Sequence, residues 1–389
     1  MPRVDFRNTA IAFERKSKKQ LKETARLFKI MNSSFLVNLG SNLTLFALKI
    51  NMPINGIIKR TIFKQFCGGA TFNECRETIK ELADYQVETI LDYGAEGKES
   101  NAAFDITVEE SIKSVRFAAE HDTVNVVSCK ITGLVSNGLL EKVSAQKQLN
   151  QKETDDYNRM LARLDTICKE AHQLKVALFI DAEESWMQDA IDQATDLMME
   201  RYNKNYVTVY NTYQMYRHDR LDFLKKSFEL AKEKKYILGA KLVRGAYMEK
   251  ERQRAKDMSY PSPIQPDKKS CDNDYNAAVK FCVDNYEKIS SCVASHNEFS
   301  TLYQLQLMDE MNIPKKHKHF NFCQLYGMSD NLTFNLAKAG YNVAKYVPYG
   351  PVRDVIPYLI RRAKENSAVD TEVSRELRLI RKELKRRKK

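Results

Sequence analysis

The most constraining feature of the sequence is an alternation of short apolar runs with helical patterns, which occurs eight times. Runs of this length are typical of parallel strands, because both faces of such strands are buried. Eight strand–helix repeats predict an α/β protein, a (βα)8 TIM barrel whose active site lies at the carboxyl ends of its strands. The predicted strands are 87–93, 125–132, 176–183, 206–214, 237–247, 289–297, 320–328 and 342–350.

The length of the chain leaves room for additions to this barrel. A barrel takes about 250 residues, whereas the chain has 389. We expect an N-terminal helical arm at 1–84, the barrel at 85–370 and a basic C-terminal helix at 371–389. Residues 30–48 carry no charge, but they contain too many polar residues for a membrane span. Their apolar residues predict an amphipathic helix packed on the protein, through Phe35, Leu36, Leu39, Leu43, Phe46 and Ala47.

The cysteines are scattered and none forms a CxxC pair, so we expect reduced, buried thiols and no metal site. The sequence also lacks a GxGxxG motif, a Walker loop, an HExxH motif and a GxSxG elbow. The N-terminus has no signal peptide, and Asp5 and Glu14 make it a poor transit peptide. We therefore expect a cytoplasmic protein, possible peripheral contact with the inner face of the membrane, and the mitochondrial matrix as the alternative location.

The net charge of +12 is concentrated at the C-terminus, where residues 371–389 contain nine Lys or Arg and three Glu. Val373, Leu377, Ile380 and Leu384 form an apolar stripe on this segment. We favour a solvated helix that docks on the protein through the stripe, and contact with anionic lipid headgroups is the alternative. No nucleic-acid partner is expected, because the basic residues lack interleaved aromatic residues.

The strongest local signal follows the eighth run, in the segment 358–366. Tyr358, Arg361, Arg362 and Glu365 share one face of the predicted helix. Two adjacent guanidinium groups are suited to bidentate binding of a planar carboxylate. The alternative is a charged outer face with an ion pair between Arg361 and Glu365.

The fifth run contains charges that are unusual in a buried parallel strand, Lys241 and Arg244. A phosphate or an anionic cofactor ring would neutralise them, and Gly245 would let a ligand approach the backbone. The alternative is a strand end with an extended lysine. Lys130 and Asp181 also end apolar runs, and we expect each to pair with the other or with an arginine, in a role that is structural or functional.

Six motifs together resemble those of the proline dehydrogenase family. The resemblance covers about residues 85–370 and implies a distorted (βα)8 barrel with non-covalent FAD. It further implies oxidation of L-proline to Δ1-pyrroline-5-carboxylate by hydride transfer to FAD, with electrons passed to a membrane quinone. The motifs are KLVRGAY at 241–247, DAEE at 181–184, TYQ at 212–214, SHN at 295–297, QLYGM at 324–328 and YLIRRAKEN at 358–366.

The resemblance also implies roles for individual residues. Arg361, Arg362 and Lys130 would bind the proline carboxylate, while Leu325 would wall the proline ring. The other substrate-site residues would be Asp181, Tyr247, Tyr346, Tyr358 and Glu365. The flavin-side residues would be Gln214, Lys241, Val243, Arg244, Gly245, Cys271, Ser295 and His296.

Two of these positions depart from the pattern of many family members: Lys241 replaces an arginine, and Cys271 replaces a threonine. His296 is equally compatible with a core histidine. A 4-hydroxyproline dehydrogenase is one alternative activity, although Tyr346 would crowd a 4-hydroxyl group. A flavin-free lyase that uses Lys130 as a Schiff-base amine is another.

Overall fold

The computed structural model describes residues 4–50, 52–94, 99–368 and 372–388, with the side chains of 365–374 outside the description. The chain divides into two compact units. The central unit is Gly97–Cys323, and the terminal unit comprises Arg3–Glu96 and Gln324–Lys389.

The strands form a closed barrel of eight in chain order, which confirms the predicted TIM-barrel fold. β2 to β7 pair in parallel succession, and β1 pairs with β8 in parallel, with Glu88 opposite Ala344. Several predicted runs extend beyond the strands, because buried loop residues such as Ile131 prolong the apolar pattern. The strands are β1 Glu88–Tyr93, β2 Val126–Cys129, β3 Ala177–Ile180, β4 Val209–Gln214, β5 Leu238–Val243, β6 Ile289–Ala294, β7 Phe320–Leu325 and β8 Val343–Tyr349.

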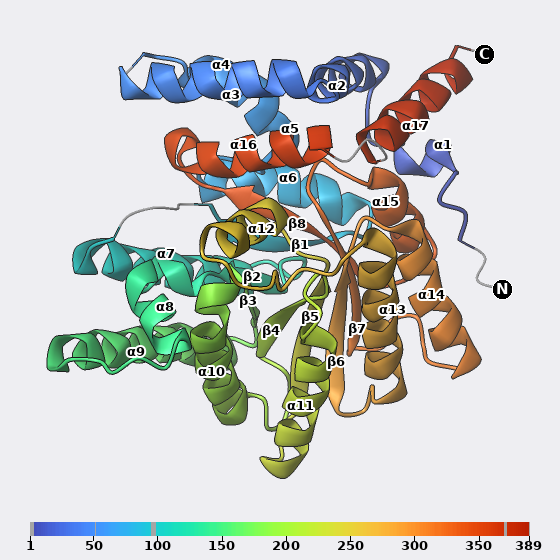
Figure 1. Ribbon diagram of the computed structural model, residues 1–389. Helices are drawn as coiled ribbons and strands as arrows, with labels where there is room; N and C mark the ends of the chain where they lie inside the picture. The colour runs from blue at the N-terminus through green and yellow to red at the C-terminus, as the bar shows by residue number, and fades with distance from the viewer. Residues whose placement is uncertain (1–3, 51, 95–98, 369–371, 389) are drawn as a thin grey trace. The chain divides into compact units, whose positions relative to one another are not determined.

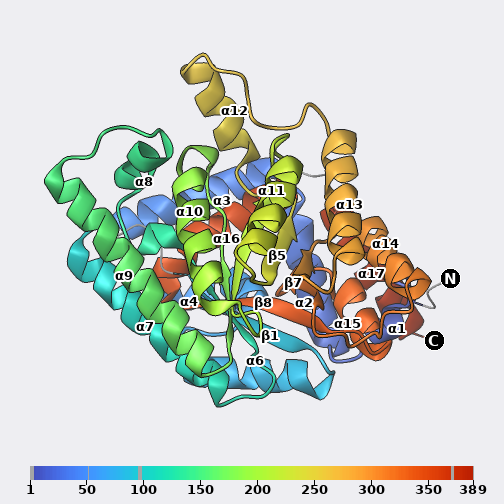
Figure 2. The same cartoon turned by 90° about the horizontal axis from the view of Figure 1, so that it is seen from below.

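Helices follow the strands of the central unit, and Figure 2 shows α7, α9 and α10 side by side. The longest, α9, begins with a capping box in which Asn150 and Glu153 exchange side-chain and backbone hydrogen bonds. The helices are α7 Asn101–Ala119, the 3-10 turn η2 Ile131–Gly133, α8 Asn137–Ser144, α9 Gln151–Gln173, α10 Ser185–Tyr202, α11 Arg220–Glu233, α12 Met248–Asp257, α13 Lys268–Asp284 and α14 Glu298–Glu310.

The helices of the terminal unit that precede β1 form the predicted helical arm, and loops and turns connect them. In Figure 1, α3 lies along α16, and the two helices are in contact. The helices are α1 Thr9–Ala12, α2 Lys18–Met31, α3 Ser34–Lys49, α4 Asn55–Ile58, the π-helical turn η1 Lys59–Phe63, α5 Lys64–Phe66, α6 Phe72–Asp84, α15 Asp330–Lys338, α16 Val352–Ala368 and α17 Glu372–Arg386.

The basic C-terminal segment forms α17, which packs against α2. Leu377 and Ile380 of the predicted stripe are buried, whereas Arg378 and Arg381 are exposed. Val373, also assigned to the stripe, has a side chain outside the described residues. Apolar docking with solvated basic residues, the favoured interpretation, therefore describes this helix.

The predicted orientation of α3 is wrong, although the helix itself is confirmed. Of the predicted packing face, Ala47 is buried, as is Val37. The other members of that face are exposed: Phe35, Leu36, Leu39, Leu43 and Phe46. The buried face also carries Ser41 and Thr44, so it consists of smaller side chains than the exposed face. Small residues allow close helix packing, and the sequence pattern alone did not reveal which side faces the neighbouring helices.

A buried ion cluster in the terminal unit connects α15, β8 and the segment between α1 and α2. Asp330 accepts from Arg15 at 3.1 Å, and its carboxylate lies 2.9 Å from the Lys16 ammonium and 3.1 Å from that of Lys345. Burial raises the pKa of Asp330, but the three cations outweigh burial and hold it well below its usual range.

The described helices include none that is long and apolar enough to cross a membrane. All the cysteines are buried free thiols, as predicted.

Candidate active site

An ionised carboxylate between two lysines lies at the strand ends of the central unit. The Lys130 ammonium donates to Asp181 Oδ2 at 2.8 Å, and the Lys241 ammonium donates to Oδ1 at 2.5 Å. Lys130 follows β2, Asp181 follows β3, and Lys241 lies within β5. The predicted pairing of Lys130 with Asp181 is thereby confirmed, and Lys241 joins the pair.

The triad of Lys130, Asp181 and Lys241 has a net charge of +1, because two ammonium groups surround one carboxylate. Burial raises the pKa of Asp181, but the two ammonium groups outweigh burial and lower it well below its usual range. The side chains of Lys130 and Lys241 are 19% and 7% exposed, so water screens these charges weakly. A triad of this kind can orient an anionic group of a ligand.

Glu183 is a buried carboxyl group that the sequence interpretation did not assign to the site. The Tyr247 hydroxyl donates to its Oε2 at 2.7 Å, and the Thr132 hydroxyl donates to its Oε1 at 2.9 Å. Burial raises the pKa of Glu183 to about 7, although the Lys130 charge and the Tyr247 hydrogen bond both act to lower it. The residue can therefore change charge near neutral pH. Its position two residues after Asp181, in the same predicted run, was the available signal.

Arg244, directly after β5, is held by a set of protein acceptors. It donates through Nε to Asp272 at 2.8 Å, through one terminal nitrogen to Ser295 Oγ at 2.8 Å and through the other to Ser300 Oγ at 2.9 Å. The guanidinium carbon lies 4.2 Å from the centre of the Tyr275 ring. Its orientation is thus fixed before any ligand binds.

The backbone at Gly245 has a φ of +136°, and an added Cβ would lie 2.5 Å from the Tyr216 ring. The Tyr216 ring therefore leaves no room for a side chain at position 245, which explains the glycine. The predicted approach of a ligand to this backbone would be a second reason for glycine. Tyr216 forms a small apolar cluster with Ile264 and Cys271. Burial raises the pKa of Cys271 to about 11, despite the nearby Arg244 charge, so its thiol is neutral at physiological pH.

The remaining predicted flavin-side residues also end strands of the central unit. Gln214 closes β4 and donates to the Glu183 carbonyl oxygen at 2.7 Å. Ser295 follows β6, and its hydroxyl accepts from the backbone N–H of Asn297 at 3.1 Å. His296, next to Ser295, and Val243, at the end of β5, are partly exposed. The central unit thus brings together the predicted groups at β4, β5 and β6.

The terminal unit contains the other predicted site residues. Leu325 ends β7 and is partly exposed, and Tyr346 is buried in β8. Tyr358, Arg361 and Arg362 lie on α16, as the helical spacing predicted. We describe these positions within the terminal unit only.

On α16 the Arg362 guanidinium carbon lies 5.5 Å from the centre of the Tyr358 ring. Tyr358 is buried, and Arg361 and Arg362 are partly exposed. The aromatic contact favours a defined position for one of the two adjacent guanidinium groups. Glu365 also belongs to α16, but its side chain lies outside the described residues, so the predicted ion pair with Arg361 stays a prediction.

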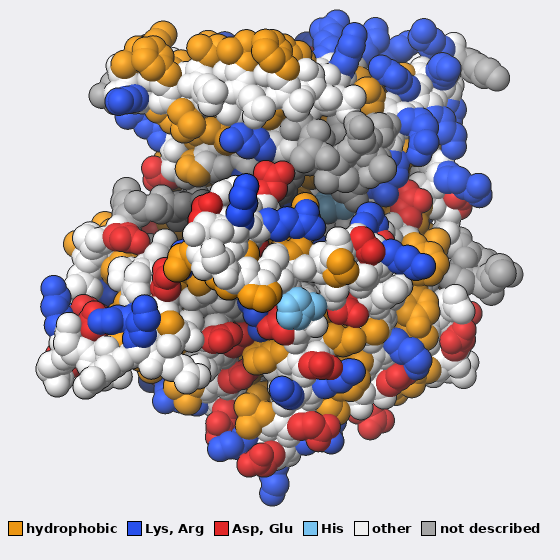
Figure 3. All heavy atoms as spheres, viewed as in Figure 1, with side chains coloured by type: hydrophobic (Ala, Val, Ile, Leu, Met, Phe, Trp, Pro, Cys, Tyr) orange, Lys and Arg blue, Asp and Glu red, His pale blue; other side chains and the backbone are white. Residues whose placement is uncertain are grey.

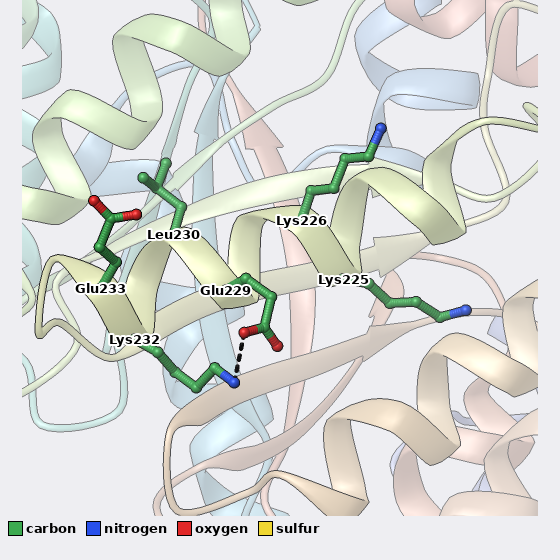
Figure 4. A pocket seen from close by; sticks show the side chains of 6 residues that line it. All are labelled: Lys225, Lys226, Glu229, Leu230, Lys232 and Glu233. Atoms are coloured by element: carbon green, nitrogen blue, oxygen red, sulfur yellow. Dashed lines mark ion pairs between the residues drawn. The ribbon is translucent and has the colours of Figure 1, made fainter.

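A surface hollow on α11 does not share this chemistry. Figure 4 shows its side chains spread along the helix, with an ion pair of 2.6 Å between Glu229 and Lys232. Charges of both signs face solvent there, as on an ordinary solvated helix. Its lining residues are Lys225, Lys226, Glu229, Leu230, Lys232 and Glu233.

Comparison with known proteins identifies the family. The sequence model described as proline dehydrogenase matches residues 75–375. The chain belongs to the proline dehydrogenase family.

Two curated relatives illustrate the range of the family. The chain is 34% identical to proline dehydrogenase 1, mitochondrial, of Dictyostelium discoideum, over 98% of this chain and 74% of that protein. It is 32% identical to the hydroxyproline dehydrogenase of Xenopus laevis, over 85% of this chain and 79% of that protein. Four other proline dehydrogenases are matched over 37% to 54% of their own length.

Solved structures agree on the fold. The chain matches proline utilization A from Bdellovibrio bacteriovorus with a TM-score of 0.73 and 21% identity. The match covers 93% of this chain and 38% of that one. At this identity the likeness establishes the barrel architecture alone.

Proposed function

We propose that this protein is an FAD-dependent proline dehydrogenase. It oxidises L-proline to Δ1-pyrroline-5-carboxylate and passes the electrons to a membrane quinone. The observation that carries the proposal is the adjacent pair Arg361 and Arg362 on α16, in a chain that belongs to the proline dehydrogenase family.

The two arginines are proposed to bind the proline carboxylate. Each guanidinium can donate two parallel hydrogen bonds to a carboxylate, a geometry that lysine does not offer. The contact of Arg362 with the Tyr358 ring supports the positioning of one of them. Holding the carboxylate fixes the orientation of the amino acid, and orientation of this kind supplies several kcal/mol of barrier reduction. Lys130 is proposed as a third cation for the carboxylate, Leu325 and Tyr346 as contacts of the proline ring, and Glu365 as a polar partner of the substrate.

In the central unit, Asp181, Lys241 and the Glu183–Tyr247 pair are proposed to tune the electrostatics around the substrate. Asp181 stays ionised and holds the two lysines, so their positions are defined. Tyr247 donates to Glu183, and the charge of that acceptor changes near neutral pH. A substrate amine that must lose a proton is sensitive to such a change.

The donor set of the central unit fits FAD, which has an anionic pyrophosphate and a ring rich in carbonyl groups. Arg244 and Lys241 supply positive charge, while Gln214 and Ser295 supply amide and hydroxyl groups, all at or near the carboxyl ends of β4, β5 and β6. Val243, Gly245, Cys271 and His296 are proposed as further contacts. When bound, FAD supplies the two-electron acceptor for the oxidation.

Oxidation of 4-hydroxyproline is the second candidate, because a relative named hydroxyproline dehydrogenase covers most of the chain. Tyr346 is the proposed discriminating residue, since its ring would crowd a 4-hydroxyl group. Comparing kcat/KM for proline and 4-hydroxyproline decides between the two substrates. The Schiff-base alternative is disfavoured, because the Asp181 carboxylate engages the Lys130 amino group, whereas a Schiff-base lysine must be free to attack a carbonyl carbon.

The proposal is tested by the visible absorbance spectrum of the purified chain, recorded anaerobically before and after addition of proline. We expect a bound-flavin spectrum that proline bleaches. Arg361→Met and Arg362→Met should each raise the KM for proline by roughly two orders of magnitude, the loss of a charged bidentate contact of about 3 kcal/mol. Flavin content should stay unchanged.

Arg353→Met is the matched control, because Arg353 is an exposed arginine in the first turn of the same helix. Its KM should equal that of the wild type. A colourless protein, or an unchanged KM in both test variants, would contradict the proposal.

A further inference from the structure

The outer face of α3 carries a continuous stripe of large apolar side chains, which we call the outer stripe: Phe35, Leu39, Leu43, Phe46 and Ile50. Phe35 is 72% exposed, Leu43 59% and Phe46 60%. Their spacing of three or four residues places them on one side of the helix, extended by Ile50 just beyond its end. A stripe of this size on the solvent side marks an interaction surface.

The apolar surface continues beyond α3. Ile30 at the end of α2, Met52, and Ile57 in α4 are also about half exposed or more. Figure 3 shows hydrophobic side chains gathered in a row along the edge where Figure 1 draws α3 and α4. The inner face of α3 meets α2 and α16 of the same unit, so the outer stripe is not needed for packing within the terminal unit.

The sequence segment that carries the outer stripe contains only positive charges, although α2 also has an exposed Glu23. Residues 24–73 contain no Asp or Glu. Lys29 and Lys49 flank the stripe at its two ends and are exposed. In Figure 3, Lys and Arg side chains gather over α2 and α17, beyond the end of the apolar row. The exposed cations of α2 are Lys18, Lys19, Lys22, Arg26 and Lys29.

We propose that the outer stripe and the cations of α2 form a docking surface for an anionic lipid bilayer. α3 lies in the plane of the membrane. Its apolar side chains insert at the boundary between headgroups and acyl chains, and its flanking lysines contact the headgroup phosphates. Charge complementarity favours this occupant, because each basic residue near an anionic membrane adds attraction. The docking belongs at the interface, since no described helix is long and apolar enough to span a membrane.

The proposal places the membrane contact on α3 and not on α17, for which lipid contact was the alternative interpretation of the sequence. The apolar residues Leu377 and Ile380 of α17 are buried within the protein, so the described side chains of this helix form no exposed apolar stripe. Its exposed Arg378 and Arg381 add general attraction only. The inference concerns the membrane contact that the proposed quinone acceptor needs, but it rests on the surface of α3 and not on the proposed activity.

The test is co-sedimentation of the full chain with vesicles made of equal parts phosphatidylcholine and phosphatidylglycerol. The variant Leu39→Gln/Leu43→Gln removes apolar area without changing charge, and we expect roughly tenfold or greater loss of vesicle affinity. Vesicles of phosphatidylcholine alone should bind the wild type more weakly. The matched control Ile106→Gln/Phe299→Gln replaces two exposed apolar residues of the central unit and should bind as the wild type does.

Three results would overturn the proposal. In the first, the α3 variant binds vesicles as the wild type does; in the second, only Arg378→Gln/Arg381→Gln loses vesicle binding. In the third, the wild type is a dimer that does not bind vesicles, and the α3 variant is a monomer. Proline oxidation with a soluble dye as electron acceptor is measured in parallel. We expect the α3 variant to retain this activity, so that loss of docking is distinguished from failure of the proposed function.

Discussion

The buried carboxyl group of Glu183 makes the stability of the protein depend on pH in a way that the structure specifies. Burial raises the pKa of Glu183 from an ordinary value of 4.5 to about 7 in the folded state. The folded state therefore binds this proton more tightly than the unfolded state does. The resulting stabilisation is complete below pH 4.5 and is lost as the pH rises through 7.

The magnitude follows from proton linkage. Between about pH 5.5 and pH 8, Glu183 lowers the free energy of unfolding by about 2 kcal/mol. Glu183→Gln cannot titrate, so its stability lacks this component. The variant also loses one acceptor for Tyr247 or Thr132, which costs about 1 kcal/mol at every pH. That constant offset does not affect the change between the two pH values.

The assay is urea unfolding followed by circular dichroism, with FAD at constant excess, for the wild type and Glu183→Gln at both pH values. The difference between the two proteins should shift by about 2 kcal/mol in favour of the variant at the higher pH. The pH profile of kcat/KM for proline should also lose an ionisation near neutral pH, if Tyr247 contacts the substrate as proposed.

Asp196→Asn is the matched control. Burial raises the pKa of Asp196 on α10 to about 7 as well, so this variant should show a similar shift in stability. Asp196 is not part of the proposed site, so its pH profile of turnover should match that of the wild type. A stability difference between the wild type and Glu183→Gln that stays constant with pH would refute the reasoning.

Two further predictions concern the scaffold of the site. Asp181→Asn leaves two ammonium groups facing a neutral amide, so its free energy of unfolding, measured in urea, should fall by about 3–5 kcal/mol. Solvent-exposed ion pairs contribute less than about 1 kcal/mol. A fall of that size would mean that the two lysines move into water in the variant. Gly245→Ala should lower the melting temperature, because its Cβ meets the Tyr216 ring at 2.5 Å. Gly40→Ala, in α3 with no atom within 4 Å of the new Cβ, should raise it slightly; equal effects of the two alanines would contradict the packing argument.

The sequence by itself determined the secondary structure and its order. Each apolar run contains a strand, and the regular alternation of short runs with helical patterns favoured strands that are covered on both faces. The spacing of Tyr358, Arg361 and Arg362 predicted one helix, and α16 contains all three. The pairing of Lys130 with Asp181 followed from the rule that buried charges need partners. These are local or pairwise requirements, and a single sequence expresses them directly.

Tertiary structure alone decided the environment of each side chain. Glu183 titrates near neutral pH because the fold buries it beside Tyr247, and Arg244 is immobilised by Asp272 and two serines distant in sequence. The sequence pattern predicted the wrong packing face for α3, because both faces of this helix contain apolar residues. Whether a side chain is buried depends on which distant segments of the chain pack against it. A local sequence pattern carries no information about this long-range packing.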